Sequence, residues 1–261
     1  MIESPKPKGV CVFYHKIFTK SGINRHLQKH LESEMIQGKP GLSYLLKIEM
    51  DPSWGRAPYF LSLWMDGEAI MDDLDTFLRN IWLECCGHMS SFTDPKKRRR
   101  SMGFGFFDVQ ELLDQGKTKE YEDYMEDHKG EIPMSKKTKN VFSKGLKLMY
   151  EYDFGSTTKL EIVVIGAYKV KAPEAIVLLS RNEPLALSCT SCAKEPANQT
   201  CTQCSYEEEA MFCEKCAEEH SESCADFEEY ASIPIVNSPR IGVCGYEGGR
   251  IDLERDVLKT L

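Results

Sequence analysis

The 261-residue sequence lacks any apolar run long enough to cross a bilayer, and its first residues contain no signal-peptide core. It also lacks a P-loop, a dinucleotide-binding glycine pattern after a strand, a His-Glu-x-x-His motif and a nucleophile elbow. These absences argue against a membrane protein and against the enzyme classes that carry such motifs. We therefore expect a cytoplasmic protein that acts by binding rather than by catalysis.

The charge is distributed unevenly along the chain. Residues 1–31 contain six Lys/Arg and one Glu, a balance of +5, whereas residues 207–230 contain ten Asp/Glu and one Lys, a balance of -9. The apolar share of 41% and the charged share of 28% are typical of a soluble globular protein with a real core. If nucleic acid is bound, a local basic surface must bind it, because the acidic segment would repel phosphate.

Seven of the eleven cysteines fall within 36 residues near the C-terminus, at the spacing of metal ligands. With one histidine they form three C-x2-C pairs and an H-x3-C: Cys189, Cys192, Cys201, Cys204, Cys213, Cys216, His220 and Cys224. Eight such ligands fill two closed tetrahedral Zn²⁺ sites, with no position left for water or substrate. Metal spacing also favours a reducing, intracellular setting over a disulfide framework.

Two connectivities fit this spacing. In the sequential one, the first two pairs hold one ion and the remaining four ligands hold the other. In the interleaved one, the first and third pairs share an ion, and the second pair joins His220 and Cys224. The interleaved order, which we favour, is similar to that of cross-braced modules such as MYND fingers, although those carry C-x3-C where this chain has Cys213-x2-Cys216.

In the simpler interpretation, zinc only holds residues 186–230 together, because this segment is too short and too polar to fold alone. The segment has few large apolar residues, so metal binding would supply much of its folding free energy, on the order of 10 kcal/mol per ion. The functional alternative adds a docking face for protein or nucleic acid on the same zinc module.

Residues 1–34 contain a sequence similar to a Cys2His2 finger, CVFYHKIFTKSGINRHLQKH at 11–30. Tyr14 stands where the second cysteine belongs, and the spacing from Phe18 to His26 is one residue short. A third, weaker zinc site would therefore use Cys11, His15, His26 and His30, with His15 as the substitute ligand. The alternatives are a finger that folds without metal and a flexible basic arm.

Basic residues in two places could contact nucleic acid. One group belongs to the finger-like segment, and the other is a five-residue run after Asp94-Pro95: Lys16, Lys20, Arg25 and Lys29, then Lys96, Lys97, Arg98, Arg99 and Arg100. Such a run contacts phosphates or acts as a nuclear address. The competing interpretation is a solvated loop.

Cys85-Cys86-Gly87-His88 could be interpreted as a Cys–His nucleophile. Free cysteine is among the most buried residue types, and these two cysteines end an apolar helix stripe, so we favour packing. Cys244 lies between small glycines and has no evident base. An enzyme that uses Cys86, His88 or Cys244 is nevertheless an alternative to a binding protein.

Residues 40–185 predict an α+β core with a mixed sheet and packed helices. Apolar runs predict strands at 44–50, 59–65, 147–154, 160–170 and 175–179. A stripe of Leu74, Phe77, Leu78, Ile81 and Trp82 predicts an amphipathic helix that begins at Asp72 or Asp73 and stops at Gly87. Residues 116–130 predict a polar helix or surface segment, and 231–261 a tail packed on the core.

Several strings resemble one family: YLLKIEM (44–50), IWLECCGHMSSF (81–92), LMYEYDFGSTTKLEIVVIG (148–166), LLSRNEP (178–184) and VNSPRIGVCGY (236–246). They are similar to the Ri-plasmid ORF-three-like domain family, also described as insertion-element passenger, TnpR-like proteins, over residues 40–250. The resemblance implies an α+β core and an association with mobile genetic elements, and it implies no established activity. Some relatives also carry an N-terminal finger and a Cys-rich segment before the NSPR stretch.

The sequence thus predicts a zinc-binding protein that binds nucleic acid through residues 1–34 and 96–100, or protein through the acidic zinc module. A protein–protein adaptor that works through the zinc module alone is the first alternative. An enzyme with its site in the α+β core is the second.

Overall fold

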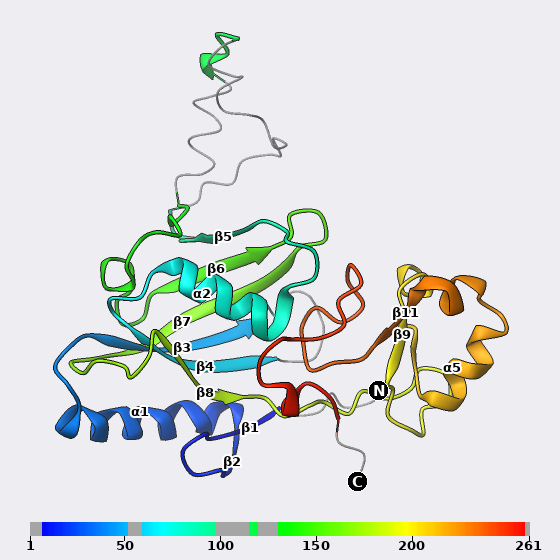
Figure 1. Ribbon diagram of the computed structural model, residues 1–261, viewed down its shortest axis with the longest axis horizontal. Helices are drawn as coiled ribbons and strands as arrows, with labels where there is room; N and C mark the ends of the chain where they lie inside the picture. The colour runs from blue at the N-terminus through cyan, green and yellow to red at the C-terminus, as the bar shows by residue number, and fades with distance from the viewer. Residues whose placement is uncertain (1–6, 52–58, 98–114, 120–129, 259–261) are drawn as a thin grey trace.

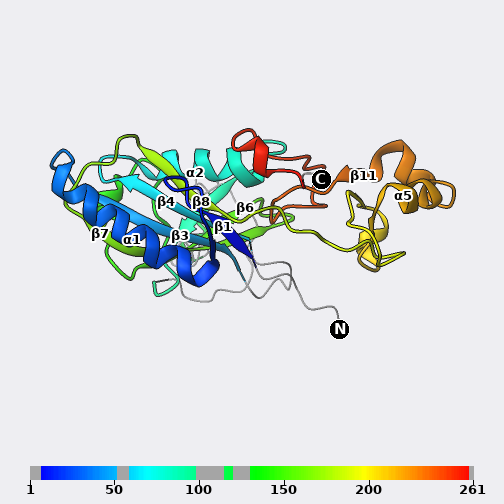
Figure 2. The same ribbon diagram turned by 90° about the horizontal axis from the view of Figure 1, so that it is seen from below.

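Figure 1 shows the computed structural model, which describes residues 7–51, 59–97, 115–119 and 130–258. A six-stranded sheet carries helix α1 on one face and helix α2 on the other, as the perpendicular view in Figure 2 makes clear. The Cys-rich segment projects from one end of this sheet. The predicted α+β class is confirmed. Within the described residues, no helix combines the length and apolarity needed to cross a bilayer.

The sheet has the order β5-β6-β7-β3-β4-β8, and every neighbouring pair is antiparallel. Its strands are β3 (Ser43–Met50), β4 (Phe60–Asp66), β5 (Ser90–Thr93), β6 (Lys147–Tyr152), β7 (Thr158–Tyr168) and β8 (Ile176–Arg181). The central strand β3 places Leu46 between Leu63 and Val164 on its two neighbours. All three side chains are buried in the core on the α2 face.

Helix α2 (Met71–Leu78) continues as a π-helical turn, η2 (Arg79–Leu83). Four residues of the predicted stripe, Leu74, Leu78, Ile81 and Trp82, are fully buried, and the fifth, Phe77, is partly buried against the same core. The predicted start is wrong: Ile70 is the N-cap, and the Asp73 carboxylate three residues later accepts the Ile70 amide at 2.8 Å. The predicted stop is also too late, because the π turn ends at Leu83 and residues 84–89 form a loop before β5. Residues 120–129 of the predicted polar helix lie outside the described residues.

The opposite face of the sheet carries the N-terminal segment, in the hairpin-then-helix order of a zinc finger. Strands β1 (Lys8–Val10) and β2 (Ile17–Thr19) pair, and α1 (Lys20–Gln37) follows with the Thr19 hydroxyl capping Gly22 at 3.3 Å. Ile23, Leu27 and Leu31, spaced one turn apart, form a second core with the sheet. The flexible-arm alternative is therefore wrong for the described part of this segment.

The Cys-rich segment folds around a three-stranded sheet of order β10-β9-β11. Its elements are β9 (Gln199–Cys201), η4 (Cys204–Tyr206), β10 (Met211–Phe212), α5 (Glu214–Ser221), η5 (Phe227–Ala231) and β11 (Ser232–Pro234). Strand β9 contributes hydrogen bonds to both neighbours, so it fixes the two sides of the segment relative to each other.

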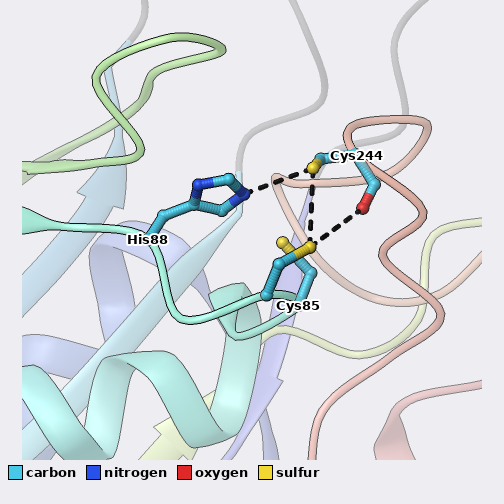
Figure 3. A group of neighbouring side chains, drawn as sticks. Cys85, His88 and Cys244 are labelled. Atoms are coloured by element: carbon cyan, nitrogen blue, oxygen red, sulfur yellow. Dashed lines mark hydrogen bonds between the residues drawn. The ribbon is translucent and has the colours of Figure 1, made fainter.

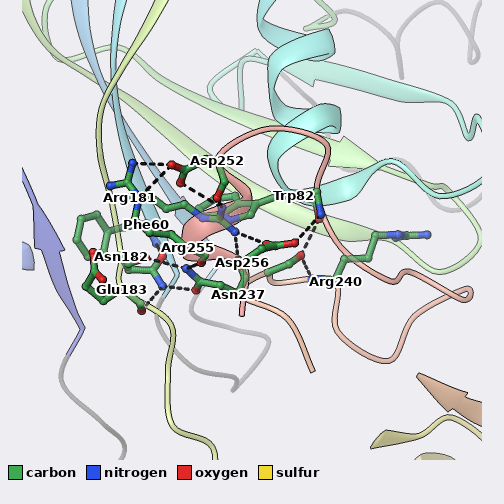
Figure 4. Close-up of polar contacts among 12 residues, drawn as sticks. Phe60, Trp82, Arg181, Asn182, Glu183, Asn237, Arg240, Asp252, Arg255 and Asp256 are labelled. Atoms are coloured by element: carbon green, nitrogen blue, oxygen red, sulfur yellow. Dashed lines mark hydrogen bonds and ion pairs between the residues drawn. The ribbon is translucent and has the colours of Figure 1, made fainter. Parts of the chain in front are cut away.

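After β11 the chain returns to the main sheet and is held there by buried polar contacts (Figure 4). Arg181, at the end of β8, is fully buried and donates to Asp256 at 2.7 Å and to the Asn237 carbonyl at 2.5 Å. The Ser238 hydroxyl donates to the Trp82 carbonyl at 2.6 Å. Buried charges require partners, and the contacts of Arg181 through Nη1 and Nη2 fix the course of residues 235–256. Two short 3-10 turns complete the described elements, η3 (Thr138–Asn140) and η6 (Leu253–Arg255).

Candidate metal centres

The first candidate site gathers two C-x2-C pairs that lie more than twenty residues apart. Its ligand atoms, from Cys189, Cys192, Cys213 and Cys216, lie within 4.8 Å of one another. Ala193 has a φ of 53°, and this left-handed residue turns the chain tightly after the first pair. The second pair lies at the start of α5, where Cys213 is the N-cap. A turn and a helix start thus present four thiols to one point.

The second candidate site joins the end of β9 to the end of α5. It consists of Cys201, Cys204, His220 and Cys224, whose ligand atoms again lie within 4.8 Å. Phe212 stacks on the His220 ring at 4.3 Å between centroids, and Phe227 meets the same ring edge-on at 5.0 Å. Two of the few large apolar side chains of the segment therefore fix the orientation of its imidazole.

These two groups are interleaved along the chain. The first and third pairs share one site, and the second pair shares the other with His220 and Cys224. A run of 36 residues thus passes three times between the sites, so both sites hold the same short stretch of chain.

The separations between ligand atoms fit tetrahedral zinc. Zinc bonds of about 2.3 Å to sulfur and about 2.0–2.1 Å to nitrogen imply edges of about 3.8 Å between sulfurs and about 3.6 Å between sulfur and nitrogen. Cys192 and Cys213 have sulfurs 3.9 Å apart, and Cys204 Sγ lies 3.9 Å from Cys224 Sγ and 3.6 Å from His220 Nε2. Sulfurs bonded to each other would be about 2.0 Å apart. All eleven cysteines are free thiols.

Burial and hydrogen bonds shift the pKa values of several of these thiols. Burial opposes ionisation of Cys189, but hydrogen bonds from backbone amides outweigh it and lower its pKa to about 6. Burial, and then the hydrogen bonds with neighbouring cysteines, raise the pKa of Cys204 and of Cys216 to about 12. Several thiolates at this spacing repel one another, so a cation is needed to hold all of them ionised together.

A third group of candidate ligands belongs to the finger-like segment and contains three of the four predicted residues. Cys11, His26 and His30 offer ligand atoms within 4.8 Å of one another. Burial, then the positive charges of His30 and nearby lysines, lower the pKa of His26, which keeps its imidazole neutral and able to coordinate. The predicted substitute ligand is wrong: His15 adopts a φ of 52° and instead lines a pocket of about 490 Å³ beside the C-terminal residues. Tyr14 covers the His30 ring, with centroids 4.4 Å apart.

The basic residues predicted to contact nucleic acid are only partly available. Lys16, Arg25 and Lys29 are exposed. Lys20 pairs with Glu49 at 3.2 Å, and Lys97 pairs with Asp94 at 3.5 Å. Lys96 is exposed, whereas residues 98–100 lie outside the described residues.

A fourth group was missed by sequence reasoning. Cys85, Cys86 and His88 from the loop after η2 meet Cys244 from the C-terminal segment, again within 4.8 Å (Figure 3). The packing interpretation is wrong for Cys86 and Cys244, which are both exposed. The two parts are more than 150 residues apart in sequence, and only the Cys85-Cys86-Gly87-His88 run of the first loop signals a ligand group. Hydrogen bonds with Cys85 and with Cys244 raise the pKa of Cys86 to about 12, the opposite of an activated nucleophile.

Comparisons with known proteins add little to this geometry. No family model matches the chain, and no curated protein matches it. One solved structure, titled a protein of unknown function MM3350 from Methanosarcina mazei Go1, is 14% identical. It covers 57% of this chain and 73% of its own, with a TM-score of 0.35, too low for an argument about fold or function. The resemblance to the Ri-plasmid ORF-three-like domain family therefore stays a prediction.

Proposed function

We propose that this chain is a zinc-binding protein in which two Zn²⁺ ions order the C-terminal segment so that it can bind a partner protein. The single observation that carries the proposal is the pair of interleaved four-ligand groups with tetrahedral spacing. Cys-rich ligand sets favour zinc among the divalent metals of the cell, and two filled shells leave no position for a reacting water. The role of the metal is thus to build a surface.

The surface so built is acidic and carries exposed aromatic rings. Ten Asp/Glu against one Lys between residues 207 and 230 give it a charge of -9. Tyr206 is 87% exposed and Tyr230 is 65% exposed, which is unusual for rings of this size. Tyrosine is enriched in protein interfaces, and acidic groups around it select a basic counterpart. We therefore assign a Lys/Arg-rich segment of another protein as the partner.

The test measures binding of a fluorescent Lys/Arg-rich peptide to the full chain by anisotropy, with and without a zinc chelator. Zinc-loaded protein should bind, the chelated protein should not, and rising salt should weaken binding. Replacing Tyr206 and Tyr230 by Ala should weaken binding at least tenfold, whereas the matched exposed change Leu253→Ala should leave it unaltered. Equal binding by the chelated and the zinc-loaded protein would refute the proposal.

Nucleic-acid binding by the finger-like segment is a second candidate function, and a specific observation favours it. Arg25 and Lys29 are exposed one turn apart on α1, and the charges of Lys16 and Lys29 reach His26 in the third ligand group. A bound cation there would add to the positive surface that attracts phosphate.

A gel-shift titration separates this candidate from the first. The Arg25→Ala/Lys29→Ala protein should lose affinity for a duplex probe at low salt, while its binding to the basic peptide stays intact. Lys139→Ala, which removes an exposed lysine on the main sheet side, is the matched control. No duplex or single-strand binding by the unchanged protein at low salt would remove this candidate.

A further inference from the structure

The loop after η2 and the C-terminal segment bring three thiols and one imidazole together on the main sheet, far along the chain from the other cysteines. We propose that Cys85, Cys86, His88 and Cys244 form an additional, solvent-accessible Zn²⁺ site. This site is separate from the two that order the Cys-rich segment, and it does not depend on the function proposed for that segment.

The separations within the group fit one shared ion. Cys86 Sγ lies 3.6 Å from Cys244 Sγ, and His88 Nε2 lies 3.2 Å from Cys244 Sγ. These values are close to the tetrahedral edges of about 3.8 Å and about 3.6 Å, and a small outward movement of the imidazole would complete the fit. Figure 3 shows the labelled side chains of Cys85, His88 and Cys244 turned toward a common point.

The residues around the group have the arrangement that supports metal ligands. With Nε2 directed at the thiols, the other ring nitrogen of His88, Nδ1, faces Asp153 Oδ1 at 3.6 Å. A carboxylate behind a ligating histidine fixes its tautomer and its ring orientation. Asp153 is in turn held by Arg240 at 2.6 Å, a guanidinium with a fully buried side chain.

The same guanidinium reaches the thiols. Arg240 Nη2 donates to Cys85 Sγ at 3.6 Å, so one cation contacts both a ligand and the carboxylate behind another ligand. Three thiolates and zinc have a net charge of -1 (+2 minus 3), and the ion pair of Arg240 with Asp153 leaves this sum unchanged while placing its positive end against Cys85. Beside an anionic metal site, a buried arginine in this position stabilises a thiolate ligand and holds the carboxylate that orients the histidine ligand.

The backbone on both sides adopts unusual conformations to present these ligands. Cys244 has a φ of 51°, uncommon for a residue with a side chain, and glycines 242 and 245 beside it have φ values of 73° and 63°. Gly87, between Cys86 and His88, has a φ of 73° with open space around it. Left-handed residues at both loops turn the ligands inward over a short length of chain.

The solvent exposure of its cysteines distinguishes this site from the two sites of the Cys-rich segment. Cys86 and Cys244 are exposed, whereas Cys189 and Cys201 in the Cys-rich segment are almost completely buried. A chelator can reach exposed ligands directly. The site should therefore release zinc first, without unfolding of the segment that holds the other two ions.

The test counts zinc in the reduced full-length protein and in three single variants. Cys244→Ser and His88→Gln should each contain one zinc per chain less than the unchanged protein, by inductively coupled plasma mass spectrometry. Met89→Ala, an exposed neighbour in the same loop, should keep the full content. A chromophoric chelator should show a fast phase of one equivalent that both ligand variants lack.

A second measurement uses the unchanged protein, so it holds even if a variant does not fold. Iodoacetamide should label Cys86 and Cys244 slowly in the zinc-loaded protein, and at least tenfold faster after the fast phase of chelation. Equal zinc content in all four proteins, or immediate labelling of both residues in the presence of zinc, would overturn the proposal. So would a Cys86–Cys244 disulfide in protein kept under reductant.

Discussion

The main sheet and the Cys-rich segment differ in what they bury. Among the residues that the structure describes, the sheet covers 26 buried apolar residues in the cluster on the α2 face and a further 11 in the cluster on the α1 face. The buried apolar cluster of the Cys-rich segment has nine members, of which four are cysteines and three are alanines. Phe212 and Phe227 are the only large apolar side chains among them, and both contact His220. The sheet can thus fold by hydrophobic burial, whereas the segment has too little apolar area to do so.

This difference explains why one chain contains both architectures. A core of leucine, isoleucine and aromatic rings needs long strands, and β3 and β7 supply them. The Cys-rich segment has too few large apolar residues for such a core, and the repulsion among the carboxylates of residues 207–230 opposes compaction further. Metal ions bound at the two candidate sites would provide both the missing cohesion and positive charge, so the segment should depend on metal while the sheet should not.

The largest expected effect is that of metal removal. A chelator should unfold residues 186–234, because each structural zinc contributes about 10 kcal/mol to folding, while the main sheet stays intact. Hydrogen exchange should show full loss of protection in β9 and α5 and retained protection in β3 and β7. Loss of protection in both regions together would mean that the sheet also depends on zinc, and the comparison would fail.

A smaller effect is expected where the C-terminal residues join the sheet. Asp256→Asn should lower the free energy of unfolding of the main sheet by about 3–5 kcal/mol, because it leaves the buried Arg181 charge without its main partner. Chemical denaturation measures this loss. The control Glu68→Gln breaks exposed pairs with Lys137 and Lys139 and should cost much less, because water screens exposed pairs. Equal costs would show that burial does not set the strength of these pairs.

The smallest expected change concerns the core alone. Leu63→Ala should lower the free energy of unfolding by about 2–5 kcal/mol through lost burial and a cavity. Its zinc content should stay unchanged. Metal removal should unfold the Cys-rich segment and leave the sheet folded, whereas this substitution should weaken the sheet and leave the metal content of the Cys-rich segment as it was. A lowered zinc content at constant stability would contradict the separation of the two regions.

Much of the fold could be predicted because its signals are local. The strand expected at 44–50 is β3, one residue longer, since its apolar run is continuous and bounded by turn residues. The α2 stripe was correct because helical period is visible within eleven residues. The N-cap was wrong because Ile70 has no capping side chain, and the compensating Asp73 lies three residues inside the helix.

The candidate metal sites also divide into those that a local sequence pattern predicts and one that only the tertiary fold assembles. C-x2-C pairs are local patterns, so the eight C-terminal ligands could be named, but spacing alone left two connectivities open. His15 was wrongly expected as a ligand, because the sequence does not show that a left-handed backbone turns it away from Cys11. The group of Cys85, Cys86, His88 and Cys244 could not be assembled, since only the tertiary fold brings the two loops together.

Zinc content of paired substitutions tests the central claim most directly. In the interleaved arrangement, Cys192→Ser/Cys213→Ser damages one site and should cost one zinc per chain, whereas Cys192→Ser/Cys201→Ser damages both and should cost two. The sequential arrangement requires the reverse. One ion lost by the first protein and two by the second would support the interleaved account, and two lost by the first with one by the second would contradict it.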